Sequence, residues 1–188
     1  AQNPKVQKHV QNVLELPDRA DALDNDWVKW AVLGYGGVYS RSSRSFGLNP
    51  AQSSYYNPVK TSGHAVVIVG WDDNFDRSRF FYNGPGAGDG LKIPPGDGAF
   101  IAKDNNGTGY GDGGYLYVSY YDAAIASELT VFMAEPASNY NRIYQHDPLG
   151  ETYYLVVPQA KPGVPAASHA ANVFTSAGDD YLAAVGFF

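Results

Sequence analysis

The chain has 188 residues, a length that fits one domain with an appendage or two small domains. Its net charge of −6 and its 13 scattered basic residues argue against a nucleic-acid partner, because phosphate binding needs clustered Lys and Arg. The chain contains no cysteine, so it has no disulfide, no thiolate metal site and no nucleophilic thiol of its own.

The composition favours β structure. Fifteen tyrosines and nine phenylalanines, together with 21 glycines and 12 prolines, are typical of strands joined by shaped loops. No apolar run reaches the roughly 18 residues of a membrane span, so we predict none. The chain opens on the polar run AQNPKVQKHV without an initiator Met and ends on the apolar run LAAVGFF, and we expect both ends to be internal or processed.

The first elements are a strand or connector and then a helix. Apolar positions alternate over residues 6–19, which predicts a strand or a short connector. Residues 24–34 predict a short helix, begun by Asp24 or Asn25 as cap and ended at Gly34. We expect its apolar face to consist of Trp27, Val28, Trp30, Ala31 and Val32.

Four later segments predict strands, at residues 36–43, 65–70, 99–104 and 115–122. The 65–70 segment is almost wholly apolar and β-branched, which indicates a central strand covered on both faces. The 115–122 segment shows the clearest alternation in the chain.

Two long connections separate these strands. Residues 40–60 are polar, and we expect Tyr55 and Tyr56 to anchor them. Residues 72–98 are rich in Gly and Pro, which predicts a long surface excursion with a short strand at RFFYN.

The pattern changes after Asp122. Short strand candidates follow one another there, separated by turns of Pro, Gly, Asn and Asp, and they predict a second, all-β unit of the sandwich type. We therefore expect a fold of the α+β class, mostly β, with one domain over residues 1–124 and a partial sandwich over residues 125–188.

His64 is the first candidate for chemistry, because it stands at the head of the buried 65–70 strand. The strand over residues 99–104 ends in polar side chains, and if the two strands pair, His64 lies beside Asp104 or Asn105. A histidine oriented by a carboxylate or an amide is two thirds of a nucleophilic triad. The nucleophile has no evident place, since no G-x-S-x-G elbow exists in the chain.

Other polar motifs have plainer interpretations. We interpret His146 as a turn residue and His9 and His169 as solvated. The WDDNFD run has the oxygen density of a calcium loop but lacks its ligand spacing, so we interpret it as a turn and predict no metal. The GTGYGDGG run is followed by no Lys-Ser/Thr and no helix, so we predict sharp turns near the cleft rather than a phosphate loop.

Two runs together carry a family resemblance. SGHAVVIVGWDDNF, followed by GAFIAKDNNGTGYGDGGYLYVSYYDA, resembles the C-terminal half of papain-like (C1A) cysteine peptidases, whose patterns are H-A-V-x-x-V-G-(W/Y) and K-N-S-W-G-x-x-W-G-x-x-G-Y. The upstream WVKWAVLGYGGVYS resembles the helix and strand that precede the histidine in that half. Residues 125–188 resemble the lectin-like β-sandwich that follows this domain in bacterial and archaeal surface members. The matching positions are His64, Ala65, Val66, Val69, Gly70, Trp71, Lys103, Gly107, Gly111, Gly114 and Tyr115.

The resemblance implies roles for named residues. His64 takes the place of the general base that forms a thiolate–imidazolium pair, and Asp104 takes the place of the asparagine that orients it. Gly63, Ala65 and Asn105 take places along the substrate cleft. An aspartate favours the charged form of the ring.

The chain also departs from the family pattern. The half that carries the cysteine and the oxyanion-hole glutamine is not among its residues. The family's Ser-Trp pair is Asn105-Asn106 here, and Tyr110 replaces the second tryptophan, so the indole that shields the histidine contact from water is missing.

Two functions remain open at this point. The chain is a fragment or subunit of a papain-like cysteine peptidase-type protein, catalytically degenerate and bound to a complementary N-terminal half, or it is a binding or structural module built on a non-catalytic papain-like scaffold. Both place the protein outside the cell or on the cell surface of an archaeon or bacterium, with a peptide or a glycan as further partner and no cofactor.

Overall fold

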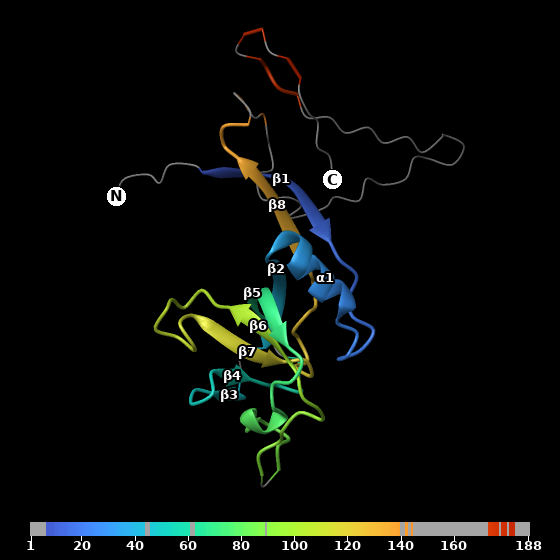
Figure 1. Ribbon diagram of the computed structural model, residues 1–188, viewed down its shortest axis with the longest axis vertical. Helices are drawn as coiled ribbons and strands as arrows, with labels where there is room; N and C mark the ends of the chain where they lie inside the picture. The colour runs from blue at the N-terminus through green and yellow to red at the C-terminus, as the bar shows by residue number, and fades with distance from the viewer. Residues whose placement is uncertain are drawn as a thin grey trace, which may run out of the picture. The chain divides into compact units, whose positions relative to one another are not determined.

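The computed structural model describes residues 7–43, 46–60, 63–88, 90–139, 142, 144, 173–176, 178–179 and 181–182. The chain divides into two compact units: one spans Leu14–Met133, and the other joins Ala1–Val13 with Ala134–Phe188. Within the described residues there are one α-helix and a large mixed sheet, so the predicted α+β, mostly β class is confirmed (Figure 1).

One eight-stranded sheet is formed by the described residues, in the order β1-β8-β2-β5-β6-β7-β4-β3. Its central pairs β2–β5, β5–β6 and β6–β7 are antiparallel, whereas β4 runs parallel to β7. Apart from the RFFYN stretch, strands are found in the segments expected up to residue 122, and the short β3 and β4 within the polar connection were not predicted. The bounds are β1 Lys8–Glu15, β2 Val38–Ser43, β3 Leu48–Asn49, β4 Ser54–Tyr55, β5 Gly63–Asp72, β6 Ala99–Lys103, β7 Tyr115–Ser119 and β8 Thr130–Pro136.

The main core lies on one face of this sheet. Side chains alternate along β5, so Val66 and Ile68 lie on the same face and are buried. Ile68 pairs across the strands with Ala102, and Ala102 pairs with Leu116, which places all these apolar side chains on that face. The histidine-bearing strand is therefore held in register by its own apolar residues.

Helix α1 (Asp26–Tyr35) packs on the core through Val28, Ala31 and Val32. The expected apolar face was wrong in part, because the side chains of Trp27 and Trp30 are 57% and 52% exposed. Three small or β-branched residues spaced by three and four positions fill one stripe of the helix, and the two indoles fall outside it.

The opposite face of the sheet carries a second cluster of aromatic side chains. The 72–98 segment supplies Phe75, Phe80 and Tyr82 to it, all nearly fully buried, so this segment is more than a surface excursion. Its RFFYN stretch is not a strand: a 3-10 turn covers Arg77–Arg79, and Tyr82 makes an isolated bridge to Lys92. The anchor expected at Tyr55 and Tyr56 is confirmed, since both side chains are buried.

The second, all-β unit rests on little described structure. β8 confirms the first of its strand candidates, and residues 173–176 are described without regular structure. Of the other candidates, only Arg142, Tyr144, Tyr181 and Leu182 are described, without regular structure, and both His146 and His169 lie outside the described residues. The sandwich and the division at 124/125 stay predictions.

Candidate active site

His64 and Asp104 come together because of the register between two strands. His64 is the second residue of β5 and faces the same side as Val66. Asp104 directly follows β6, whose Lys103 pairs with Val67. The two side chains therefore meet diagonally across the strands, with Nε2 of His64 3.4 Å from Oδ2 of Asp104. The predicted pairing of these strands is confirmed.

Asp104 is held in place by its own loop. Its side chain is only 1% exposed, and its Oδ1 accepts a hydrogen bond of 2.9 Å from the Asn106 N–H. Its backbone N–H donates to the Gly114 carbonyl over 2.9 Å, so the glycine-rich loop folds back on the carboxylate. Oδ2 is left on the side of His64. Asn105, the other candidate for this role, is exposed.

This arrangement determines what the imidazole can do. The 3.4 Å contact is in the range of an ion pair and is longer than a short hydrogen bond. A carboxylate at that distance stabilises a protonated ring and orients Nε2. Nδ1 then lies on the side of the ring away from Asp104. The His64 side chain is 23% exposed, so a group outside the chain can reach it. The geometry suits a base that accepts a proton and later returns it, with the carboxylate beside the charged ring in between.

The neighbouring strand β2 adds charges that sequence reasoning missed. Arg41 pairs in register with Ala65, one of the three expected cleft residues, and a second of them, Gly63, pairs with Ser43. Nη1 of Arg41 lies 2.7 Å from Oε1 of Glu128. A β-carbon built on Gly63 would lie 2.5 Å from Nε of Arg41, so the guanidinium passes close over the entrance of β5. The polar run VYSRSS was the only signal, and it does not tell which strand it joins.

A second missed residue, Asp122, lies in a buried network beside these strands. It is 3% exposed, and its carboxylate accepts hydrogen bonds of 3.0 Å from each of the N–H groups of Asn57, Ala124 and Ile125. Burial nevertheless raises the pKa of Asp122 to about 6, and the hydrogen bonds only partly offset that effect. Asp122 thus ties the segment at Asn57 to its own turn and titrates near neutral pH.

The acidic WDDNFD turn is occupied by structural contacts. Oδ1 of Asp73 lies 2.6 Å from Nζ of Lys29 and accepts a 2.8 Å hydrogen bond from the Tyr120 hydroxyl. The Lys29 ammonium keeps the pKa of Asp73 below its usual value. Across the described ranges, no group of three or more His, Asp or Glu side chains is arranged to hold a metal. In the same part of the chain, no helix is long and apolar enough to cross a membrane.

Comparison with known proteins was made at three levels. No family model and no curated protein matches the chain. Among solved structures, the clostridial cysteine protease Cwp84 after propeptide cleavage is 27% identical with a TM-score of 0.54, and the match covers 70% of this chain and 31% of that one. The cysteine protease and lectin-like domains of Cwp84, a surface layer associated protein of Clostridium difficile, are 26% identical with a TM-score of 0.57, and the match covers 75% and 29%. Bromelain from Ananas comosus is 16% identical with a TM-score of 0.39, and the match covers 67% and 51%.

These matches relate the fold to one class of protein. The chain spans 31% and 29% of the two Cwp84 chains, less than a third of either. The solved structures that it resembles are papain-like cysteine proteases, and the Cwp84 structure in the longer match includes a lectin-like domain.

Proposed function

We propose that the chain is the C-terminal, histidine-bearing half of a papain-like cysteine peptidase-type protein. His64 is the base of the site, Asp104 positions its ring, and Gly63, Ala65 and Asn105 lie along the cleft. The proposal is carried by the 3.4 Å contact between Nε2 of His64 and a buried carboxylate that its own loop fixes. The likeness in fold to Cwp84 supports it.

The reaction needs a thiol that this chain does not contain. In acyl transfer by a cysteine, the histidine takes the thiol proton, the thiolate attacks the peptide carbonyl, and the imidazolium returns the proton to the leaving amine. His64 can accept and return that proton, while the carboxylate of Asp104 stabilises the imidazolium in between. A complementary segment with the cysteine is therefore the partner we propose, and the chain without it hydrolyses nothing.

The test is peptide hydrolysis by the native protein that carries this chain together with its complement. We expect His64→Ala to lower the rate by on the order of 10²–10⁴-fold, the usual contribution of a general base. His9→Ala is the matched control, since it removes a histidine from β1 and should leave the rate unchanged. Loss of activity in both variants, or in neither, would reject the role of His64.

A non-catalytic scaffold is the second candidate, and one observation favours it. Asn105 and Asn106, at the positions of the family's Ser-Trp pair, are both exposed, so no indole from these positions keeps water from the His64–Asp104 contact. On this view the complement carries no reactive cysteine and the native protein shows no hydrolysis. Its function then lies in binding at the cell surface, where we place the protein under either hypothesis, with a lectin-like sandwich over residues 125–188 as the binding part.

A further inference from the structure

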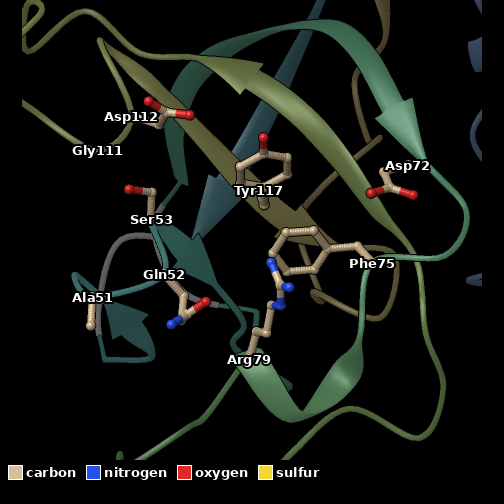
Figure 2. Close-up of a pocket in the computed structure, with 9 residues that line it drawn as sticks. All are labelled: Ala51, Gln52, Ser53, Asp72, Phe75, Arg79, Gly111, Asp112 and Tyr117. Atoms are coloured by element: carbon tan, nitrogen blue, oxygen red, sulfur yellow. The ribbon is translucent and has the colours of Figure 1, made fainter.

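A pocket of about 400 Å³ opens on the face of the sheet opposite to His64. Tyr117 lies at its centre, and Asp112 and Asp72 lie on either side of that ring in Figure 2. Tyr117 pairs with Ile101 and so points away from the face that holds Ala102 and His64. Asp72 ends β5 eight residues after His64, roughly 26 Å along the strand. The pocket is therefore separate from the candidate active site.

The aromatic floor of this pocket is rigid. Tyr117 stacks on Phe75 with ring centroids 4.5 Å apart and an interplanar angle of 19°. The guanidinium of Arg79 lies 5.3 Å from the centroid of the Phe75 ring. Phe75 itself is 5% exposed and covers one side of the Tyr117 ring, so Tyr117 offers a ligand chiefly its hydroxyl.

Hydrogen bonds between the walls preform the pocket. The Tyr117 N–H donates to the Ser53 carbonyl over 2.9 Å, and the Ser54 hydroxyl donates to the Arg79 carbonyl over 2.7 Å. Asp112 is fixed by reciprocal backbone bonds of 2.9 and 3.0 Å with Tyr115. The three wall segments are thus tied to one another without a ligand, which lowers the ordering cost of binding.

The lining determines the class of ligand. The lining offers both hydrogen-bond acceptors and donors around the aromatic floor. These groups are two carboxylates, one guanidinium, the Gln52 amide and the hydroxyls of Ser53 and Tyr117. A cationic ligand would be repelled by the charge of Arg79, and an anionic ligand would be repelled by the charges of Asp72 and Asp112. A neutral polyol avoids both repulsions, because each of its hydroxyl groups can donate to a carboxylate and accept from the guanidinium.

We propose that this pocket binds a neutral saccharide. Its volume lies in the range of small-ligand pockets, which is about 300–1,000 Å³. The Tyr117 hydroxyl, Asp112, Gln52 and Arg79 bind the hydroxyls of the sugar. The site requires no nucleophile and does not depend on the role of His64.

The experiment is a titration of the full chain with cellotriose, mannotriose and triacetylchitotriose, followed by amide chemical shifts. N-acetyl-lysine methylamide and glucuronate serve as cationic and anionic probes. We expect saturable binding of at least one trisaccharide, with the amides of Ser53, Asp112 and Tyr117 shifted and no binding of the charged probes. Asp112→Ala should weaken binding at least tenfold.

Controls separate this pocket from the rest of the chain. Asp26→Ala removes an exposed carboxylate from the first turn of α1 and should leave the affinity unchanged, as should His64→Ala. Tyr117→Ala should abolish binding. Gln52 lies on the exposed rim, so Gln52→Ala should weaken binding at the same site without disturbing the aromatic stack. The inference is overturned if no trisaccharide binds, if Asp112→Ala and Gln52→Ala bind as tightly as the wild type, or if a charged probe takes the pocket instead.

Discussion

At the scale of a single side chain, Asp104 is the residue that we propose positions the ring of His64. It stands where the papain-like pattern has an asparagine, and its Oδ2 still reaches Nε2 of His64. An asparagine at this place offers one oxygen with the same geometry and no charge. Orientation of the ring thus needs the oxygen, whereas stabilisation of the imidazolium needs the carboxylate.

That division predicts the behaviour of two variants. Asp104→Asn in the native protein with its complement should keep peptide hydrolysis within about tenfold of the wild type, because the amide oxygen takes the place of Oδ2 beside Nε2. Asp104→Ala should lose about 10–100-fold, since nothing then orients the ring. The hydrolysis rates of the two variants provide the measurement. Equal losses would show that the charge, and not the position of an oxygen, is what matters.

Asp122 gives a prediction for stability against pH. The pKa of Asp122 is raised from 3.8 to about 6, so the folded protein keeps a proton that the unfolded chain releases between about pH 4 and 6. The free energy of unfolding should therefore fall as the pH rises through that window, by on the order of 3 kcal/mol. The stabilising contribution is fully present below about pH 4.

Urea unfolding at pH 4 and at pH 6.5 measures this effect. In Asp122→Asn, the difference in unfolding free energy between pH 4 and pH 6.5 should shrink by most of that amount. This holds even if the substitution lowers the unfolding free energy equally at both pH values. An unchanged difference would mean that another group titrates in this window.

At the scale of elements, the glycine-rich loop shows which glycines are required. Gly111 and Gly113 have nearly the same backbone angle, with φ of +60° and +61°. A β-carbon on Gly111 would lie 2.2 Å from the Tyr115 carbonyl oxygen, whereas one on Gly113 would meet nothing within 4 Å. The two glycines therefore share a backbone angle, but only Gly111 lacks room for a β-carbon.

The two alanine variants therefore form a matched pair. Gly113→Ala should lower the free energy of unfolding by about 1–2 kcal/mol, the cost of a left-handed backbone for an L-residue. Gly111→Ala should cost clearly more, because the start of β7 must shift to make room. Urea unfolding of both variants measures the difference. Costs within about 0.5 kcal/mol of one another, the spread of a surface substitution, would refute the close approach of Gly111 to β7.

The sequence predicted elements better than it predicted their faces. The apolar run of β5 and the alternation of β7 identified both strands, and the pairing of β5 with β6 followed from their lengths and apolarity. Helix α1 is apolar on several sides, so composition did not tell that Val28 turns inward and Trp30 outward. The short strand β4 was missed because two residues carry no periodicity, and only its pairing with β7 makes it a strand.

The site was predictable where it lies on a strand and not where it depends on long-range pairing. The contact between His64 and Asp104 could be expected because each residue stands at one end of an apolar run. The Arg41–Glu128 pair and Asp122 were not found, because their partners lie far along the chain or in the backbone. Likewise, the pocket around Tyr117 joins segments from Ala51 to Tyr117 that share no local pattern.

At the scale of the whole molecule, the central claim concerns the catalytic cysteine, which this chain does not contain. The chain spans less than a third of the Cwp84 chains that it resembles and contains no cysteine, yet it holds a histidine beside a fixed carboxylate. We propose that a second segment completes the site. A complement of this kind would also cover the side of His64 that Asp104 leaves open.

The most direct test is an intact-mass measurement of the native protein after treatment with a thiol-reactive epoxide probe, without added protease. The account predicts a complementary segment that carries one probe adduct on a cysteine, and no adduct on that segment when His64 is replaced by alanine. A complement without a cysteine, or with one that the probe leaves unmodified in the wild type, would contradict it and leave the papain-like fold here as a binding scaffold.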